Sequence, residues 1–525
     1  MEFFLPVNYL CNNEPEYYHD DQAANSAMVY QPEVYDFVAD LVKSKGARTV
    51  VDIGCGNAGK LMAIHADRIV GVDYGANIAA CKSKYGDRGI WLEEDFEQIQ
   101  TGILSKFFGP DCLIVCSDVI EHLVDPTALL NVLRVAFAAG ATIVTSTPDR
   151  ILVRGPTHLG PPPNLAHVRE WALVEYKAFL ESAGLPCHYI GYTLNNSVDR
   201  KLRTILSLHD GMIEQARQKL PEMTANFQKP LAIIAAYNEE DVLEEVVRDW
   251  VAQGCNVHLI DNWSSDQTYE IMQHLSSVFP EAVRIERFPE SNLEQGEWKE
   301  ILKRKEAIAA QNPDRWVIHT DADEVRRSMF QDLSLAEAFM VAQAYGANRV
   351  SFNLINFRPV ASQISDSVQG TLAQMSYFEF GDRPGHFYQA KAWYQGEERV
   401  ELSSSGGHDA VLSEQRDFPY RFLLKHYPLR SLEHAERKIK IERADRFSKF
   451  ETQELGWHQH YSHLQLGAGK AWNFENLFLF DDQFWERHGL VMISGLADKI
   501  YLESEPRSPA NATQYAHMLQ QRIWG

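Results

Sequence analysis

Apolar positions along the chain change their spacing in a regular way. Between Val34 and Val42 they recur every three or four residues, and residues 49–53 then form a short run that is apolar at Val50, Val51 and Ile53. The first spacing is typical of a helix with one buried face, and the second of a buried strand. Further apolar runs follow at residues 69–73, 90–93, 112–116 and 142–146, with helical stretches between them. This alternation predicts an α/β domain built on a doubly wound parallel sheet.

A second alternating series begins at Leu231. Strands are expected at residues 231–236, 256–261, 282–287 and 316–320, and helices at 241–253, at 266–277 and in a segment that ends near Gln311. Beyond Arg327 the pattern is mixed and rich in aromatic residues, and beyond Ser431 it is largely helical. We therefore expect two domains, at residues 1–210 and 230–430, joined by a linker at 211–229, with 431–525 as a helical extension of the second domain.

Residues 147–168 are rich in proline and glycine and are too long to be a simple connector. Loops of this length in a compact domain are usually lids or binding loops. A helix is expected directly after it, at residues 170–182. Two histidines, His158 and His167, lie on this predicted lid.

Composition narrows the classes of function. The 525 residues are 45% hydrophobic and 23% charged, as in a globular enzyme. A formal charge of −22 repels phosphate backbones and anionic lipid, which argues against nucleic acid and bulk membrane as partners and leaves room only for a peripheral membrane contact. Seven cysteines without a CxxC pair indicate reduced thiols. With no export signal and no membrane-spanning stretch, these features predict a cytoplasmic protein.

A glycine turn follows the first predicted strand. Gly54, Gly56 and Gly59 satisfy the pattern GxGxxG, and Asp73 ends the next strand about twenty residues later, where an acidic group meets ribose hydroxyls. These residues alone would also suit an NAD-binding site. Asp52, however, precedes the glycines, where a carboxylate disfavours a pyrophosphate but attracts a ligand with ammonium and sulfonium charges. A second acidic group at residues 93–95 could read an adenine amino group.

The strings VDIGCGNAG, GVDYG, LEEDFE and CSDVIEHLVDP resemble the successive motifs of class I S-adenosylmethionine-dependent methyltransferases, over roughly residues 30–200. The resemblance implies a Rossmann-like fold and S-adenosyl-L-methionine as cofactor. It also implies that the methionine end is held by Asp52, Gly54 and Gly56, the ribose by Asp73, the adenine by Asp95, and the methyl end by Ser117 and Asp118. The strings TPDR and AHVREW resemble the branch that methylates small molecules.

Methyl transfer occurs at a preactivated carbon, so alignment supplies much of the rate. A hydroxyl acceptor still benefits from a general base. His167 is our candidate for this base, with His158 as the other possibility on the lid, although either could simply bond to loop backbone. We interpret His122, four residues after Asp118, as structural.

The second series carries its polar residues at strand ends. Tyr237 and Glu239 follow the first strand of this series, Asp261 ends the second, and HTDADE ends the fourth. Asp321 and Asp323 are two residues apart, a spacing that projects both carboxylates to one side of an extended segment. Such a pair suits a hard divalent cation, which would in turn accept a diphosphate.

Together with GGHDA, LLKHYPLRS and GWHQHY, these strings resemble the inverting family 2 glycosyltransferases of GT-A fold, over roughly residues 229–465. The resemblance implies a nucleotide-sugar donor. It places Tyr237, Glu239 and Asp261 at the nucleoside, and Asp321 and Asp323 at Mn²⁺ or Mg²⁺ and the diphosphate. His408 resembles the late histidine that completes the metal shell in some members.

An inverting transfer needs a base for the acceptor hydroxyl. Glu379, Asp382 and Asp409 are the candidates, and their spacing does not separate them. Lys391, Lys425 and Arg430 are candidate cations for phosphate, although ordinary ion pairs would use the same residues. The basic residues from Arg437 to Lys449 alternate with acidic ones, so we interpret them as a solvated helix face.

These features predict a bifunctional enzyme, an S-adenosylmethionine-dependent O-methyltransferase fused to a metal-dependent glycosyltransferase. Its substrates would be a nucleotide sugar and a glycan or glycosylated small molecule, in surface polysaccharide or glycoconjugate biosynthesis. One alternative makes the first domain an NAD-dependent oxidoreductase that modifies the nucleotide sugar. Another makes one domain a non-catalytic binding module.

Overall fold

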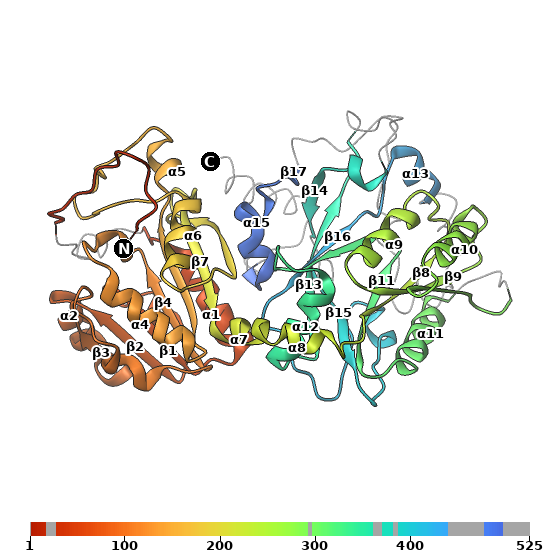
Figure 1. Ribbon diagram of the computed structural model, residues 1–525, viewed down its shortest axis with the longest axis horizontal. Helices are drawn as coiled ribbons and strands as arrows, with labels where there is room; N and C mark the ends of the chain where they lie inside the picture. The colour runs from red at the N-terminus through yellow and green to blue at the C-terminus, as the bar shows by residue number, and fades with distance from the viewer. Residues whose placement is uncertain are drawn as a thin grey trace. The chain divides into compact units, whose positions relative to one another are not determined.

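The polypeptide forms two sheets, each within its own compact unit (Figure 1). The computed structural model describes residues 2–16, 28–291, 297–360, 370–381, 387–438 and 477–496. The first unit comprises Met1–Gln218 together with Gln483–Gly525, and the second comprises Lys219–Asp482. The predicted α/β class, with one sheet in each half of the chain, is confirmed.

The first sheet has the strand order β3-β2-β1-β4-β5-β7-β6. Its first five strands pair in parallel, as the alternating pattern predicts, but β7 is antiparallel to both of its neighbours. The five predicted strands are thus confirmed as parallel, and β6 and β7, which the pattern did not predict, extend the sheet with antiparallel pairing. The strands are β1 (Thr49–Ile53), β2 (Arg68–Asp73), β3 (Ile90–Glu93), β4 (Cys112–Ser117), β5 (Thr142–Pro148), β6 (Tyr189–Leu194) and β7 (Leu202–Asp210).

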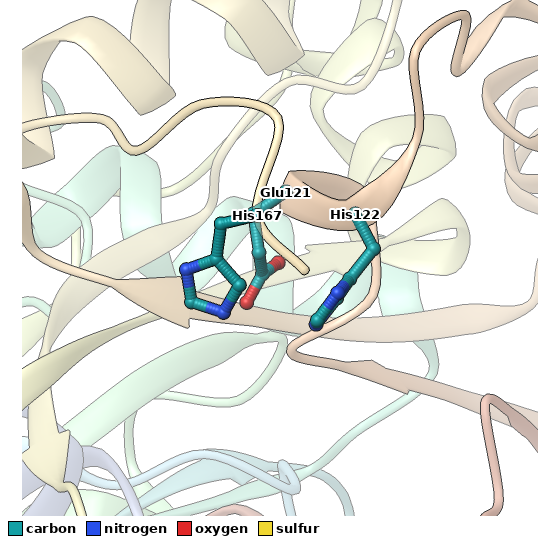
Figure 2. Close-up of side chains that lie close together, drawn as sticks. All are labelled: Glu121, His122 and His167. Carbon is teal, nitrogen blue, oxygen red and sulfur yellow. The ribbon is translucent and has the colours of Figure 1, made fainter. Parts of the chain in front are cut away.

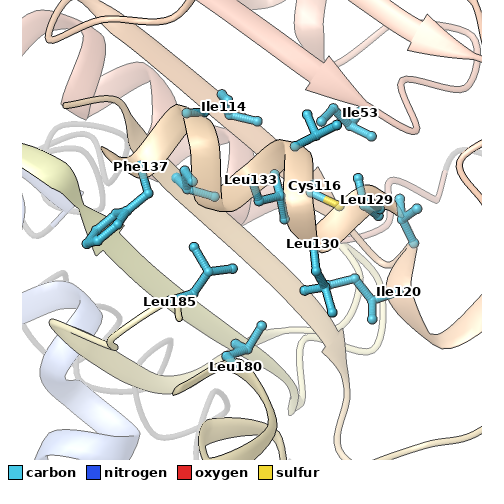
Figure 3. Packing of buried hydrophobic residues seen from close by; sticks show 14 of the residues in the cluster. Ile53, Ile114, Cys116, Ile120, Leu129, Leu130, Leu133, Phe137, Leu180 and Leu185 are labelled. Carbon is cyan, nitrogen blue, oxygen red and sulfur yellow. The ribbon is translucent and has the colours of Figure 1, made fainter. Parts of the chain in front are cut away.

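Side chains alternate between the faces of a strand, and this alternation positions the first site. Val51 and Ile53 of β1 belong to the core formed with α4 and α6 (Figure 3). Asp52 points to the other face, where Tyr35 of α1 contacts it. The helices of this unit are α1 (Pro32–Lys45), α2 (Ala76–Tyr85), α3 (Thr101–Leu104), α4 (Thr127–Ala138), α5 (Arg150–Arg154), α6 (Leu173–Ser182) and α7 (Gly211–Gln218), with 3₁₀ turns at Leu61–Ala63, Gly86–Arg88, Ser105–Phe107 and Ile120–His122.

A late helix, α15 (Phe484–Ile493), belongs to the first unit and packs on β6. The Tyr189 hydroxyl donates to the carbonyl of Trp485 at 3.4 Å, and a Cβ on Gly489 would lie 2.4 Å from the Tyr189 ring. We expected all of residues 431–525 to extend the second domain, and for α15 that expectation is corrected. The glycine lets the helix approach the tyrosine more closely than any side chain would allow.

The second sheet runs β10-β9-β8-β11-β15-β13-β14-β17, and β16 pairs with β12 and β13. Strands β10, β9, β8 and β11 are parallel, and β15 joins β11 in antiparallel orientation. The strands are β8 (Leu231–Ala236), β9 (Asn256–Asp261), β10 (Val283–Arg287), β11 (Arg315–Asp321), β12 (Glu324–Arg327), β13 (Arg349–Phe357), β14 (Tyr377–Phe380), β15 (Tyr388–Gln395), β16 (Phe422–His426) and β17 (Phe478–Leu479).

Helices of the second unit bury one face against this sheet. Leu302 and Ile308 of α11, for example, share a core with Ile233 of β8 and Trp393 of β15. The helices are α8 (Leu220–Thr224), α9 (Leu243–Ala252), α10 (Thr268–Val278), α11 (Trp298–Ala310), α12 (Leu335–Tyr345) and α13 (Leu432–Arg437), with 3₁₀ turns at Leu372–Gln374 and Ser403–Ser405. No helix in the described ranges has the length and hydropathy needed to span a membrane.

Candidate active sites

The glycine turn after β1 is held in place by Asp73. The amide of Gly56 donates to Asp73 Oδ2 at 2.7 Å, and the amide of Tyr74 donates to Oδ1 at 2.7 Å. Gly54 and Gly56 have φ angles of +83° and +53°, and a Cβ on Gly54 would lie 2.3 Å from the side chain of Val119. Only glycine fits these conditions. The residues expected at the cofactor's methionine and ribose ends thus come together at one edge of the sheet.

Asp52 lies under this turn and is fully buried. The Tyr35 hydroxyl donates to both of its oxygens, at 3.3 Å and 3.1 Å. Burial raises the pKa of the Asp52 carboxyl to about 7, even though Lys60 and the Tyr35 hydrogen bond favour its charged form. A carboxylate in this condition gains from a cationic ligand, because a nearby positive charge offsets the cost of burying the negative one.

Ser117 ends β4 and Asp118 follows it, at the same edge of the sheet. Asp118 has a φ of +52°, and its carboxylate accepts hydrogen bonds from Ser146 Oγ at 2.6 Å and from Gln31 Nε2. The hydroxyl groups of Ser117 and Ser146 are 2.8 Å apart. Burial raises the pKa of Asp118. Asp95 is different, since it is exposed and bonds to the Glu97 amide within its own turn.

The predicted lid returns to the sheet next to Asp118. The amide of Val168 donates to the Glu121 carbonyl at 2.7 Å, so the lid backbone is joined to the turn after β4. His167 Nδ1 lies 2.8 Å from Glu170 Oε1, and its Nε2 lies 2.9 Å from Asn164 Nδ2. His158 Nδ1 instead accepts from the Gly160 amide at 3.3 Å, within the loop. Of the two base candidates, the structure brings His167 to the site.

Asp321 ends β11 in the second unit. Its Oδ1 is buried and has no hydrogen-bond partner within the described residues, while Oδ2 lies 3.5 Å from Lys391 Nζ. Burial alone would raise the pKa of this carboxyl, but the ammonium groups of Lys391 and Lys305 outweigh it and hold the pKa below its ordinary value. Asp321 is therefore ionised and presents an oxygen that protein donors leave unsatisfied, as a metal ligand would be before binding.

Asp323 is buried among cationic groups. Its Oδ2 lies 3.2 Å from Lys438 Nζ and 3.9 Å from Arg430 Nη1, and its Oδ1 lies 3.7 Å from His426 Nε2. A metal ion bound by Asp323 would therefore replace part of these contacts with a bond to the carboxylate. These contacts fix the position of the carboxylate.

Glu324 holds the turn between these two aspartates. Its Oε2 accepts from the Asp321 amide at 3.1 Å and from Arg326 Nη2 at 2.9 Å, and its Oε1 accepts from Lys391 Nζ at 2.9 Å. Burial opposes ionisation, but Lys391 and Arg326 prevail and lower the pKa of Glu324 to about 2. With both oxygens committed, Glu324 positions the aspartates.

The residues expected to contact the nucleoside lie at the carboxyl ends of two neighbouring strands, β8 and β9. Tyr237 is partly buried just after β8. Asp261 is fully buried at the end of β9, where it accepts from Arg287 Nε at 2.7 Å and from the Ser264 amide at 3.1 Å. Glu239 accepts from Arg430 Nη2 at 2.6 Å and lies 3.2 Å from Lys438 Nζ. Lys438 contacts Asp323 as well, so one ammonium group joins the two predicted subsites.

Arg430 occupies what could otherwise be a metal site. Glu239, Asp241 and His434 offer ligand atoms within 4.8 Å of one another. The guanidinium nitrogen Nη2 lies 2.6 Å, 2.7 Å and 2.8 Å from these three side chains. The cation of this cluster is therefore Arg430 itself.

The remaining predicted residues lie at different distances from the two aspartates. His408 is exposed and lies close enough to Asp321 and Lys391 to interact with them electrostatically. Glu379 on β14 pairs with Arg358, and Asp409 beside β15 pairs with Arg349 at 2.6 Å. Lys425 contacts the aromatic rings of Phe357 and Phe480. Asp382 and the string GWHQHY lie outside the described residues.

Two residues near Asp323 are not in the predicted site. Lys438 was expected on a solvated helix face, yet it is buried and pairs with Glu239 and Asp323, which corrects that interpretation. His426 on β16 bonds through Nδ1 to Asn356 Oδ1 at 2.8 Å, which directs Nε2 towards Asp323. The spacing of Arg430, His434 and Lys438, four residues each, is a sequence signal for one helical face that could have found Lys438.

Comparison with known proteins decides the class of the second unit. Residues 231–329 match the model of the family described as glycosyl transferase family 2. The second unit thus contains a segment that is similar to family 2 glycosyl transferases. The match begins at β8 and includes the segments that hold Tyr237, Glu239, Asp261, Asp321 and Asp323. No curated protein matches the chain.

Solved structures similar to part of the chain include three S-adenosylmethionine-dependent methyltransferases. The one from Clostridium acetobutylicum ATCC 824 is 13% identical, covers 36% of this chain and 94% of its own, and has a TM-score of 0.27. The one from Mesorhizobium loti is 16% identical with coverage of 34% and 97% and a TM-score of 0.26. The one from Aquifex aeolicus is 14% identical with coverage of 34% and 89% and a TM-score of 0.24.

Proposed function

We propose that this chain is a bifunctional transferase. The first unit would be an S-adenosylmethionine-dependent O-methyltransferase, and the glycosyl transferase domain would be an inverting, metal-dependent enzyme with a nucleotide-sugar donor. The observation that carries the first half is the fully buried Asp52 beneath the glycine turn, with its pKa raised by burial. The second half is carried by the family match and by the unsatisfied oxygen of Asp321.

Two features favour S-adenosylmethionine over NAD in the first unit. A pyrophosphate near Asp52 would place negative charge beside a buried carboxylate, whereas ammonium and sulfonium groups compensate it. The sheet also departs from the order 3-2-1-4-5-6 that is usual for dinucleotide-binding domains, since β7 enters antiparallel next to β5. The oxidoreductase alternative has neither feature in its support.

The chain's residues would bind and orient the cofactor as follows. Asp52, Gly54 and Gly56 would hold the methionine end, Asp73 the ribose, Asp95 the adenine, and Ser117 and Asp118 the region near the methyl group. When bound, S-adenosylmethionine supplies a methyl group on a sulfonium centre, ready for displacement. The glycine turn and Asp73 are already fixed by the bonds to Gly56 and Tyr74, so little ordering is needed on binding.

His167 is the proposed proton acceptor for a hydroxyl substrate. Its Nδ1 faces the Glu170 carboxylate, which favours the tautomer with the proton on Nδ1 and a lone pair on Nε2. Glu170 would then stabilise the ring when Nε2 takes up a proton. His167 also lies near enough to Asp118 to influence its pKa, which supports a role for the histidine near the proposed methyl end.

The donor atoms around Asp321 fit a hard divalent cation. We propose that Asp321 and Asp323 hold Mn²⁺ or Mg²⁺, with His408 or His426 as the nitrogen ligand on the same side. A bound ion supplies Lewis-acid stabilisation of the leaving diphosphate. Lys438 and Lys391, both buried beside the aspartates, would contribute positive charge to the same phosphates, while Tyr237, Glu239 and Asp261 would contact the nucleoside.

Glu379 and Asp409 are the proposed bases for the sugar acceptor within the described residues. Each is held by an arginine, and burial raises the pKa of Asp409. Substitution separates them: the base variant, Glu379→Gln or Asp409→Asn, is expected to lose transfer at least a hundredfold while still binding donor, whereas loss of a purely structural carboxylate weakens both.

A joint binding experiment tests the whole proposal. Calorimetry of the full chain with S-adenosylhomocysteine and with NAD, and thermal shift against a panel of nucleotide sugars with Mn²⁺, should give binding of the first ligand and of at least one sugar donor. Binding of NAD without S-adenosylhomocysteine would transfer support to the oxidoreductase alternative. We place the activity in the cytoplasm, in surface polysaccharide or glycoconjugate biosynthesis, with peripheral contact to a membrane where the acceptor requires it.

A further inference from the structure

A buried group of possible metal ligands lies in the first unit, beside the proposed methyl end. Glu121, His122 and His167 each offer one ligand atom, and these atoms lie within 4.8 Å of one another. Figure 2 shows the carboxylate of Glu121 between the two imidazole rings, whose centroids are 4.7 Å apart. Glu121 and His122 come from the 3₁₀ turn after β4, and His167 from the end of the lid. Residues far apart in the sequence thus meet at one point.

The Glu121 carboxylate is the feature that calls for a ligand. The residue is fully buried, and neither of its side-chain oxygens has a hydrogen-bond partner within the described residues. Burial, together with the nearby Asp118, raises the pKa of this carboxyl well above its ordinary value. The nearby Thr147 hydroxyl favours the charged form, although it too makes no well-formed hydrogen bond within the described residues. A buried acid without partners is costly unless a proton or a cation joins it.

Both histidines are held in the orientation that metal ligands require. His122 Nδ1 lies 2.9 Å from the Ala166 carbonyl, which can only accept, so Nδ1 carries the proton and Nε2 the lone pair. Burial, aided by His167, lowers the pKa of His122 to about 3 and keeps the ring neutral. His167 Nδ1 faces Glu170 at 2.8 Å in the same manner. Oxygen acceptors behind the ring are the usual support of metal-bound histidine.

The backbone keeps the three residues together. The Glu121 carbonyl accepts from the amides of Val168 and Arg169, at 2.7 Å and 3.4 Å, so the residue after His167 is anchored on Glu121 itself. Ligand bonds of about 2.1 Å separate metal ligands by roughly 3 to 4 Å. The three donors therefore need to close by about 1 Å, and the Asn164 amide at 2.9 Å from His167 Nε2 would give way.

We propose that Glu121, His122 and His167 bind a divalent transition-metal ion next to the methyl acceptor. Two imidazoles and one carboxylate suit Zn²⁺, Mn²⁺ or Fe²⁺. The site would hold an acceptor through its oxygen atoms, which favours a hydroxyl-bearing substrate such as a sugar or a catechol-like ring over an amine. This inference rests on the proposed methyl transfer, and it assigns to His167 the role of ligand in place of that of a free base.

The test uses the full chain and Co²⁺, whose visible absorption reports nitrogen ligands. Because Asp321 and Asp323 are expected to bind metal too, the parent is the variant Asp321→Asn, Asp323→Asn, stripped with chelator. Into it we would introduce Glu121→Gln or His167→Gln, with the exposed His65→Gln as the matched control. Calorimetry gives the stoichiometry, and S-adenosylhomocysteine binding is measured on every variant.

The parent and its His65→Gln derivative are expected to bind Co²⁺ at the cluster with visible absorption. Glu121→Gln and His167→Gln should each lose one equivalent, or bind it at least a hundredfold more weakly, with S-adenosylhomocysteine binding intact. Equal Co²⁺ binding in the parent and in both cluster variants, or no Co²⁺ binding in the parent, overturns the inference, since Glu121 is then compensated by a proton. If one variant does not fold, the other decides. Loss of S-adenosylhomocysteine binding in the parent would instead count against the proposed methyltransferase.

Discussion

The carboxylates of the two sites are buried to a similar degree but stand in opposite electrostatic surroundings. In the first unit, burial raises the pKa of Asp52 and Asp118, and the protein supplies too little positive charge to reverse it. In the second unit, Lys391 and neighbouring cations lower the pKa of Asp321 and Glu324 in spite of burial.

The difference teaches what each site lacks before its ligand arrives. The first lacks positive charge, and a cationic cofactor would provide it. The second already holds its carboxylates charged, so a metal can bind without first displacing protons, and surrounding lysines are available to an anionic donor. Removing a buried cation from the second unit should therefore lower its stability. Removing the buried acid Asp52 from the first unit should raise stability and weaken cofactor binding.

The largest effect is expected from Lys391→Met. Removal of this buried ammonium takes away the cation that Glu324 Oε1 contacts at 2.9 Å and leaves Arg326 to compensate the buried carboxylate through Oε2. Breaking such a pair costs about 3–5 kcal/mol, so the second unit should unfold at a markedly lower urea concentration. The double variant Lys391→Met, Glu324→Gln should recover part of the loss. Unchanged stability of Lys391→Met would show that Arg326 alone compensates Glu324.

Asp52→Asn should act in the opposite direction on stability. The pKa of Asp52 is about 7 in the folded protein against 3.8 ordinarily, so its ionisation destabilises the fold as pH rises through that window and the cost is complete above pH 7. Without ligand, the asparagine variant is expected to be more stable at pH 8, by an amount on the order of a few kcal/mol. It should also bind S-adenosylmethionine roughly 30- to 150-fold more weakly, from the loss of about 2–3 kcal/mol of charge-assisted contact.

Thermal shift at pH 8 with and without S-adenosylhomocysteine measures both effects on one sample. A variant that loses stability and keeps its affinity would contradict the role given to Asp52.

The pH dependence of binding should separate the two sites. A cationic ligand binds ionised Asp52, so protonation below pH 7 competes with it and Kd for S-adenosylmethionine should rise about tenfold per pH unit. Between pH 7.5 and 5.5 this amounts to roughly 30-fold. Donor binding with Mn²⁺ should change by less than about threefold over the same range, because Asp321 and Glu324 stay ionised. Calorimetry across this range measures Kd for both ligands. If Kd changed with pH to the same extent for both, the proposed electrostatic difference between the two sites would be contradicted.

The smallest effect is expected from Tyr35→Phe. Its hydroxyl donates to Asp52 and favours the charged form, so its loss raises the pKa of Asp52 further. A hydrogen bond of about 1 kcal/mol corresponds to roughly fivefold weaker S-adenosylmethionine binding at pH 7. Tyr85→Phe, on α2 away from Asp52, serves as the control and should leave Kd unchanged. Equal Kd values for the two variants would mean that Tyr35 only packs.

Sequence was sufficient where a strand end decides the position of a residue. The run at residues 49–53 is β1, and the apolar runs before Asp73 and Asp321 are β2 and β11. Because parallel strands share one carboxyl edge, the motif residues of each unit could be expected to meet there. The α/β class and the two sheets follow from the same periodicity.

Partners from distant segments could not be read in this way. Lys438 reaches Glu239 across 199 residues, and Arg430 reaches it across 191. A helix full of charges gives the same pattern whether it faces water or a buried carboxylate. The sequence also could not show that the buried Glu121 carboxylate has no hydrogen-bond partner among the described residues, since the string that contains it is a plausible helix start. Strands β6 and β7 were not predicted from the sequence because their residues carry no motif and mix polar with apolar side chains.

The return of α15 to β6 has a consequence for synthesis. Strand β6 forms part of a unit whose first 218 residues leave the ribosome long before Phe484 does. During that interval the surface around Tyr189 lacks its covering helix, while the whole intervening second unit is still being translated. The packing of the amino-terminal unit on β6 can therefore be completed only after α15 has emerged, and a chain stopped before Phe484 would leave the surface around Tyr189 uncovered.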